Sequence, residues 1–148
     1  GEPIMPTRTV GFDKVQRKLK KMSKAVDDMD DKTLMKVTGE VRNRIVKRTM
    51  RGRDSDMKSF KPYSTDYSKF RAKKGKKTGR PNLVMTFAML GNMSFKKIRG
   101  GSMIHFTSTA QNDKAYWNQQ SREFFGLSKH NHKYVLSELR KPVVKAMR

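Results

Sequence analysis

Few residues of this sequence are of the types that hold metal ions. It has three histidines and no cysteine; His130 and His132 flank Asn131, and His105 lies elsewhere in the chain. Zinc sites combine thiolates, imidazoles and carboxylates, and two histidines without neighbouring acids make a poor ligand set. The lack of cysteine also rules out disulfide bonds. We therefore expect no metal site and interpret these histidines as exposed loop residues.

Nucleophilic and acid–base chemistry have no better candidates. The serines include no Gly-x-Ser-x-Gly motif, the turn that exposes the nucleophile in many hydrolases. Only 13 residues are acidic, and their largest cluster, Asp27 to Asp31, falls where one helix is expected to end and the next to begin. Acids at such a junction stabilise a helix N-terminus through the helix dipole. We expect no catalytic residue and no cofactor, and hence a non-enzymatic protein.

Phosphate binding is the third kind of chemistry to consider. From Lys69 to Arg80 the chain has seven bases and no acid, but its glycines lack the spacing of a P-loop. This run either contacts nucleic-acid phosphates without sequence preference or is a solvated basic loop. Together with bases of the preceding helix it forms a predicted basic surface for an acidic partner or DNA: Arg42, Arg44, Arg48, Arg51, Arg53, Lys73, Lys74, Lys76, Lys77 and Arg80.

Net charge is the compositional outlier. Lysine and arginine number 35 against 13 acids, for a formal charge of +22, and all but one unit of it follows Asp31. Such a surface attracts polyanions or acidic protein faces and repels copies of itself. No stretch approaches the roughly 18 apolar residues of a membrane span, and the N-terminus lacks the apolar core of a signal peptide. We therefore expect no membrane partner.

Helical periodicity must supply the elements that position these residues. Apolar residues recur every three or four positions over 12–26, 34–49 and 135–147, so three helices are predicted. Gly52 is expected to stop the second helix, which should begin near Lys32. Pro142 is expected to kink the third or to end its regular part.

The remaining segments are shorter or polar. Residues 1–11 are predicted as an extended arm, and 52–81 as a long basic loop. Residues 82–93 suit a strand or a short helix, and periodicity cannot decide between them. Gly100-Gly101 between two β-prone runs predicts a hairpin. The chain is thus expected to be one α+β domain over 1–148, with a small antiparallel sheet containing a β-hairpin, packed by two N-terminal helices and a C-terminal helix.

Aromatic residues suggest where the protein meets its partners. Tyr63, Tyr67 and Phe70 could stack on bases of single-stranded nucleic acid, although such residues more often pin a loop to the core or to a partner. Around Gly126 the chain gathers arginine, phenylalanine and leucine, and arginine and aromatic residues are the types that dominate protein interfaces. Of the two adjacent phenylalanines there, we expect one to face the core and one an interface. The predicted assembly interface comprises Phe60, Tyr63, Tyr67, Arg122, Phe124, Phe125 and Leu127.

Three stretches of the sequence together carry a resemblance to a known family. They are Ile45-x-x-Arg48-Thr49-x-x-Gly52-x-Asp54 followed by Phe60-Lys61-Pro62-Tyr63-Ser64-x-x-Tyr67, then Asn82-Leu83-x-x-Thr86-x-x-Met89-Leu90, and then Arg122-Glu123-Phe124-Phe125-Gly126-Leu127-Ser128. In this order and spacing the chain, over residues 12–140, resembles the virion-morphogenesis, or tail-completion, family of long-tailed phages. The family commonly has glycine where this chain has Phe87.

The resemblance implies a structural protein of the phage head–tail junction, with no catalytic residues to carry over. Similar proteins assemble as rings, often sixfold, so the expected partners are copies of the chain and the adjacent connector and tail proteins, with DNA in the channel as a further candidate. The expected location is the virion neck, after a period in the host cytoplasm. The alternative function is a basic nucleic-acid-binding module that contacts phosphates non-specifically.

Overall fold

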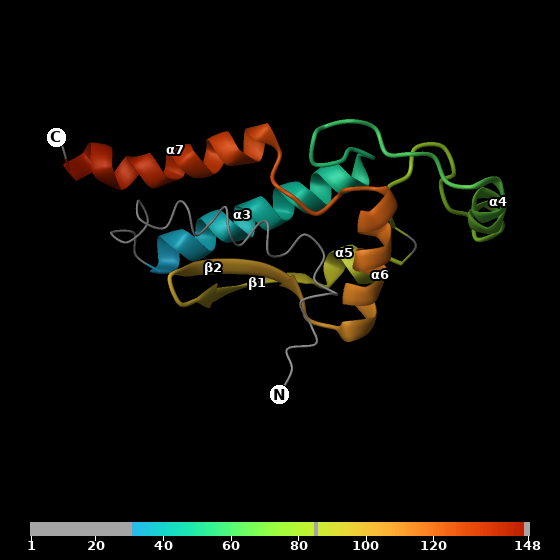
Figure 1. Cartoon of the computed structure of the whole chain (residues 1–148), viewed down its shortest axis with the longest axis horizontal. Coiled ribbons are helices and arrows are strands. Elements are labelled where there is room, and N and C mark those ends of the chain that lie inside the picture. The colour runs from blue at the N-terminus through green and yellow to red at the C-terminus, as the bar shows by residue number, and fades with distance from the viewer. Residues whose placement is uncertain (1–30, 85, 147–148) are drawn as a thin grey trace.

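The computed structural model describes residues 31–84 and 86–146, with side chains described as far as Lys141. The predicted extended arm, 1–11, and the first predicted helix, 12–26, lie outside the described residues. Figure 1 shows a long helix, α3, between a β-hairpin and the C-terminal helix α7, with the shorter helices α5 and α6 at one end of the hairpin. Helix α4 stands apart from this body (Figure 1).

Helix α3 (Asp31–Met50) forms where its apolar stripe predicts it. Leu34, Val37, Val41 and Ile45 are all buried, because residues three and four apart share one face of a helix. The helix ends at Gly52, whose φ of +76° suits a residue without a side chain. The amides beyond the last turn donate back to the carbonyls of Thr49 and Arg48, which closes the helix with a Schellman motif. The predicted stop at Gly52 is confirmed.

The predicted hairpin is present and forms the sheet of the described chain. Strand β1 (Met93–Ile98) pairs antiparallel with β2 (Gly101–Phe106), and Met93 lies opposite Phe106. Since Ile98 pairs with Gly101, the two turn residues are Arg99 and Gly100 rather than the two glycines. Gly100 takes a φ of +78°, so it supplies the left-handed conformation that the tight turn needs.

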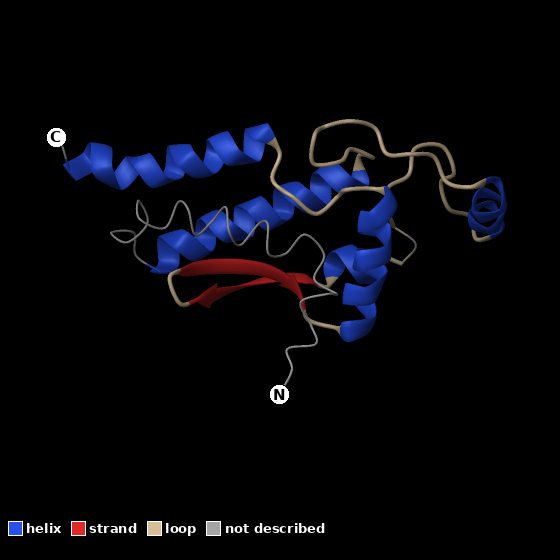
Figure 2. Ribbon diagram, in the orientation of Figure 1, coloured by secondary structure: helices blue, strands red, loops and turns tan. Residues whose placement is uncertain are grey.

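Helix α7 (Lys129–Ala146) packs against α3 on the side away from the hairpin, as Figure 2 also shows. Ser128 caps its first turn by accepting a hydrogen bond from the amide of Asn131 at 3.1 Å. The helix continues past Pro142 to Ala146, so Pro142 does not end it. His130 and His132, expected in a loop, lie in the first turn of this helix.

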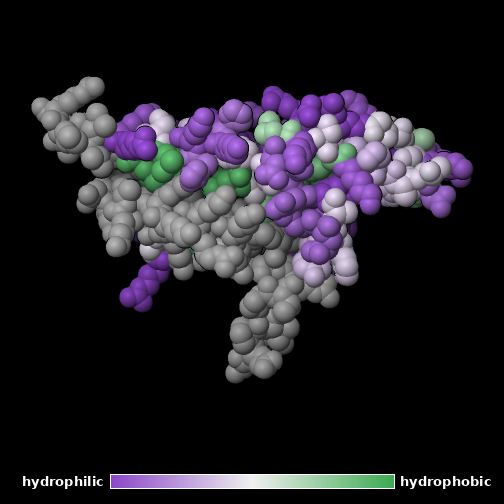
Figure 3. All heavy atoms as spheres, turned by 45° about the horizontal axis from the view of Figure 1, so that its top comes forward, coloured by the Kyte–Doolittle hydropathy of each residue, from purple (hydrophilic) through white to green (hydrophobic). Residues whose placement is uncertain are grey.

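Three short helices complete the described chain, and none has an apolar period that marks it in the sequence. Residues 82–93 contain both predicted alternatives, because the helix α5 (Ala88–Gly91) leads directly into β1. Helix α6 (Thr109–Ser121) follows the hairpin, and helix α4 (Thr65–Lys73) lies inside the segment predicted as a loop. Figure 3 shows hydrophilic side chains over most of the described part of one face, interrupted by small hydrophobic patches.

Five helices and one antiparallel hairpin in the described residues confirm the α+β class. The core is a single cluster in which the α3 stripe meets residues of the hairpin, of α5 to α7 and of the segment 124–127. Within the described ranges, no helix is both long enough and apolar enough to cross a membrane.

Candidate functional site

Two stretches that lie far apart in the sequence meet at the C-terminal end of α3. Arg48 is buried there, and its Nη2 donates to the carbonyl of Phe124 at 2.6 Å and to that of Gly126 at 3.0 Å. These bonds join two stretches that lie more than seventy residues apart in sequence. Hydrogen bonds from a charged donor are stronger than neutral ones, so this is a firm link between α3 and the segment before α7.

Burial has an electrostatic cost at Arg48. Desolvation lowers the pKa of its guanidinium below its usual range, to about 10, and the charges of Asp54 and Asp56 partly oppose this shift. A pKa near 10 leaves the group protonated at neutral pH, so it remains a charged donor. Within the described residues, its Nε and Nη1 atoms are buried without hydrogen-bond partners. Arg48 is therefore an internal connector rather than a surface cation.

Backbone hydrogen bonds also attach the segment after α3 to the stretch that begins at Glu123. Ser55 donates its amide to the carbonyl of Glu123, and Phe60 donates to the carbonyl of Gly52. Asp54 holds the turn between them, since its Oδ1 accepts from the amides of Asp56 and Lys58 at 2.9 and 2.8 Å. These hydrogen bonds place the Phe60 side chain in the core, and the chain continues from there to Tyr63.

Tyr63 is the joint between the body and α4. Arg122 donates to the carbonyls of Lys61 and Pro62, each at 2.8 Å, and its guanidinium carbon lies 4.8 Å from the centre of the Tyr63 ring. The hydroxyl of Tyr63 accepts a hydrogen bond from the amide of Leu83 at 3.1 Å. The second and third resemblance stretches thus meet at one aromatic ring.

A second arginine holds α4 from its other end. Arg71 is only 1% exposed, and it donates to the carbonyls of Lys77 and Val84 and to the side-chain oxygen of Asn82. Its guanidinium carbon also lies 4.8 Å from the Tyr63 ring centre, within the range of a cation–π contact. We define the arm as residues 64–80, which contain α4 and the basic chain after it; Arg71 and Tyr63 anchor it.

Both ends of α4 have capping residues that can be recognised in the sequence. Ser64 accepts a hydrogen bond from the amide of Tyr67 at the N-terminus. At the other end Gly75 has a φ of +68°, and the amides of Gly75 and Lys76 return to Ala72 and Arg71 in a Schellman motif. A serine cap followed at helical distance by a glycine stop was the signal that could have found this helix.

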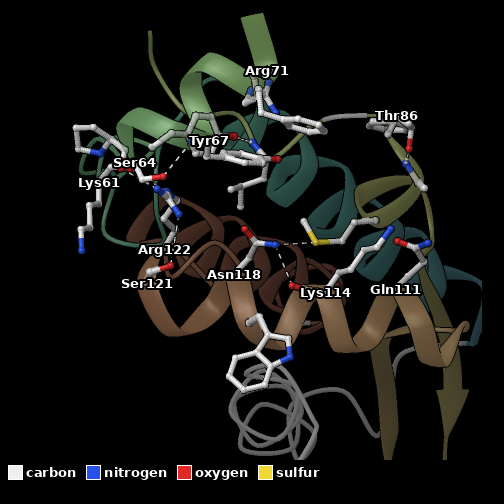
Figure 4. Close-up of a pocket in the computed structure, with 18 of the residues that line it drawn as sticks. Lys61, Ser64, Tyr67, Arg71, Thr86, Gln111, Lys114, Asn118, Ser121 and Arg122 are labelled. Carbon is white, nitrogen blue, oxygen red and sulfur yellow. Dashed lines mark hydrogen bonds between the residues drawn. The ribbon is translucent and has the colours of Figure 1, made fainter. Parts of the chain in front are cut away.

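Between the arm and α6 lies a cleft of about 950 Å³. Figure 4 shows Ser64, Tyr67 and Arg71 on one side of it and Lys114, Asn118 and Ser121 of α6 on the other. Exposed aromatic side chains of Tyr67, Phe70, Phe87 and Trp117 line it. Among the described residues, its lining includes four cations and no carboxylate. The cleft is therefore an apolar groove with a positive potential.

Phe87 occupies an unusual backbone position on this cleft. Its φ of +66° lies in the left-handed region, where a glycine has no steric cost and a bulky residue is strained. The ring of Phe87 lies against Gly91, since a Cβ built there would be 2.9 Å from the ring.

The predicted assembly interface is partly wrong. Phe124 and Phe125 are both buried, at 0% and 1% exposure, and their rings pack on Phe106 rather than dividing between core and surface. Phe60 and Leu127 are buried as well. The physical reason is that these apolar side chains close the core under the start of α7. Tyr63, Tyr67 and Arg122 do lie at the cleft.

The predicted basic surface divides in a similar way. Arg48 is internal, which corrects its assignment to the surface. Arg42 and Arg44 are half-buried and engaged: Arg42 donates to the carbonyl of Met93, while Arg44 pairs with Glu40 and lies over the Tyr134 ring. The others reach solvent: Arg51, Lys73, Lys74, Lys76, Lys77 and Arg80 are exposed, and Arg53 is half-buried.

Sequence reasoning missed four residues that define the site: Arg71, Phe87, Lys114 and Trp117. Arg71 looked like one base among seven in a run, and only its position on α4 turns it inward. Lys114 and Trp117 lie one turn apart on α6, a helix with little amphipathic pattern to reveal it. Within the described chain, no group of three or more acidic or histidine residues is placed to hold a metal ion.

Comparison of the chain with known protein families, curated proteins and solved structures finds no match.

The arm should loosen when its buried anchor is removed. Replacing Arg71 with methionine keeps much of the side-chain length but deletes three hydrogen bonds. The free energy of local unfolding of the arm should therefore fall by about 2 kcal/mol. Trypsin cleavage of the native protein within the arm should then be roughly 30-fold faster. Lys73→Met is the matched control, because it also removes one cleavage site but from an exposed position. Equal cleavage rates for the two variants would contradict this role.

Proposed function

We propose that this protein is a non-enzymatic structural component of the head–tail junction of a long-tailed phage. The observation that supports the proposal is the convergence of the resemblance stretches. Arg48, Tyr63 and Arg122 connect them through hydrogen bonds and ring contacts into one support for the arm. A support that holds an aromatic, basic arm away from the body suits a protein whose work is contact with neighbours.

The proposed assembly is a ring of copies, sixfold or related, between the connector and the tail. In this arrangement the exposed bases of the arm meet acidic faces of adjacent proteins or DNA in the channel. Repulsion among chains of formal charge +22 favours a soluble monomer in the host cytoplasm before such partners neutralise it. Assembly is then driven by complementary neighbours rather than by self-association alone.

An image reconstruction of the intact particle tests this proposal. We expect the chain in a ring at the neck, with the arm in contact with a neighbouring subunit or with a connector or tail protein. The body formed by the hairpin, α3 and α7 should fit the ring density without rebuilding. Absence of the chain from purified particles would overturn the proposal.

A nucleic-acid-binding module is the second candidate, and the exposed lysines of the arm favour it. Replacing Lys73, Lys74, Lys76 and Lys77 with glutamine would then flatten the dependence of DNA affinity on salt by about four units of slope. The matched control replaces Lys32, Lys36, Lys47 and Lys58, which are also exposed, and removes the same charge. For a nucleic-acid-binding module, only the arm variant should lose this salt dependence; for a junction protein, only the arm variant should lower particle yield.

A further inference from the structure

The cleft between the arm and α6 has features of a ligand-binding site that go beyond positive charge. Its exposed aromatic side chains come from three separate elements: Tyr67 and Phe70 from α4, Phe87 from the start of α5, and Trp117 from α6. Trp117 is 63% exposed and Phe70 47%. Large apolar side chains gathered at a concave site mark binding grooves, because leaving them in water is unfavourable.

The charges around the cleft select the kind of ligand. Lys61 and Lys114 are exposed, and Figure 4 shows Lys114 on α6 among the residues that line the cleft. Arg71 and Arg122 add positive potential although their guanidinium groups are committed to carbonyls of the chain. With no carboxylate among its described lining residues, the cleft favours an acidic ligand and disfavours another basic copy of this body.

The arrangement of the rings argues for a peptide rather than a nucleic acid. Base stacking needs ring faces that are open. Tyr67 is packed edge to face against Tyr63, with 5.0 Å between ring centres, and stacked with Phe70 at 6.0 Å. These rings present a continuous apolar wall, which an aliphatic or aromatic side chain can enter. Only two exposed lysines among the lining residues are available to follow a phosphate backbone.

The backbone strain at Phe87 points to the same use. A phenylalanine held at a φ of +66° is disfavoured relative to glycine, and such strain persists where the surrounding structure gains from it. Here it directs an aromatic ring to the cleft wall, supported by Gly91, where a larger residue would collide with the ring. The strained backbone thus contributes directly to the lining of the cleft.

We infer that this cleft binds an acidic peptide segment of a neighbouring protein, one that inserts an aromatic or aliphatic side chain between the arm and α6. This inference rests on the proposed function, because it names the chemistry of the partner that the junction protein would meet. The apolar anchor would lie among Tyr67, Phe70 and Trp117, and acidic residues beside it would pair with Lys61 and Lys114. Trp117 is the only tryptophan of the chain, so its fluorescence reports on this site alone.

The test is a fluorescence titration of the full chain with the peptide Glu-Glu-Phe-Leu-Glu-Glu. We expect a saturable change in Trp117 emission with a dissociation constant below about 1 mM. A peptide with lysine in place of glutamate, and one with serine in place of the Phe-Leu pair, should each bind at least about tenfold more weakly. No saturable change with the acidic peptide, or tighter binding of a short oligothymidine, would overturn the inference.

Paired variants locate the binding on the cleft. Phe70→Ala should weaken peptide binding about tenfold, whereas Met50→Ala, at the same 47% exposure outside the cleft, should not change it. Lys114→Glu should weaken binding as much, and Lys133→Glu on α7 should leave it unchanged. Equal effects within either pair would show that the peptide binds elsewhere and would reject the cleft as the site.

Phe87→Gly gives a test in which stability and binding move in different directions. Glycine relieves the strain at a φ of +66°, so the melting temperature should be no lower than that of the unmodified protein, while peptide binding should weaken. Unchanged binding would remove the argument from strain and count against the inference. A particle reconstruction distinguishes this inference from the proposed function. A neck ring with an empty cleft would contradict this inference alone, whereas absence of the chain from the particle would contradict the proposed function.

Discussion

Replacing Arg48 with alanine is expected to lower the free energy of unfolding by about 3 kcal/mol. The variant leaves the buried carbonyls of Phe124 and Gly126 without their donor, at about 1–3 kcal/mol for each unsatisfied group. It also leaves a cavity where the side-chain stem was packed. Removing a charge that desolvation disfavours offsets part of this loss, in keeping with the pKa lowered to about 10. For a chain of this length the melting temperature should fall by roughly 10 °C.

Two further variants separate the causes of that loss. Arg48→Met keeps most of the packing and removes only the hydrogen bonds, so its melting temperature should lie between those of the alanine variant and the unmodified protein. Arg51→Ala, an exposed arginine less than one turn further on, is the matched control and should change stability by less than about 0.5 kcal/mol. If Arg48→Met were as stable as the unmodified protein, the link between α3 and the segment 124–126 would contribute nothing.

Replacing Phe124 with alanine is expected to cost about 3–5 kcal/mol, a larger loss than that of Arg48→Ala. Its ring is fully buried and lies 6.4 Å from that of Phe106 and 6.2 Å from that of Phe125, centre to centre. Truncation therefore opens a cavity at the point where β2 meets the segment before α7. Equilibrium unfolding in urea, with the slope unchanged, measures this loss directly.

The same measurement distinguishes a core role from an interface role. Phe125→Ala should destabilise the isolated protein by a similar amount, since its ring is also buried. Phe70→Ala, at an exposed ring of the cleft, should cost less than about 1 kcal/mol. A stable Phe124→Ala or Phe125→Ala protein that failed only in assembly would restore the interface hypothesis for that residue.

Much of the body of this protein was predictable from short-range rules. The stripe of α3 and its stop at Gly52 follow from helix periodicity and from the freedom of glycine to take a positive φ. The hairpin follows from the two glycines between β-prone runs, with its turn displaced by one residue. Helix α7 follows from its apolar spacing and from the cap at Ser128. All are local patterns that the chain contains whatever it packs against.

What sequence by itself determined is therefore the class of the fold, the positions of its long helices and hairpin, and the excess of positive charge. Only the tertiary structure decided which charged and aromatic residues face inward. Arg48 and Arg71 resemble two more surface cations until carbonyls from outside their own helices surround them. Phe124 and Phe125 turn inward, while Trp117 and Phe70 turn outward to the cleft. The physical reason is that burial is set by contacts between segments far apart in the chain, whereas periodicity reports only on neighbours one turn away.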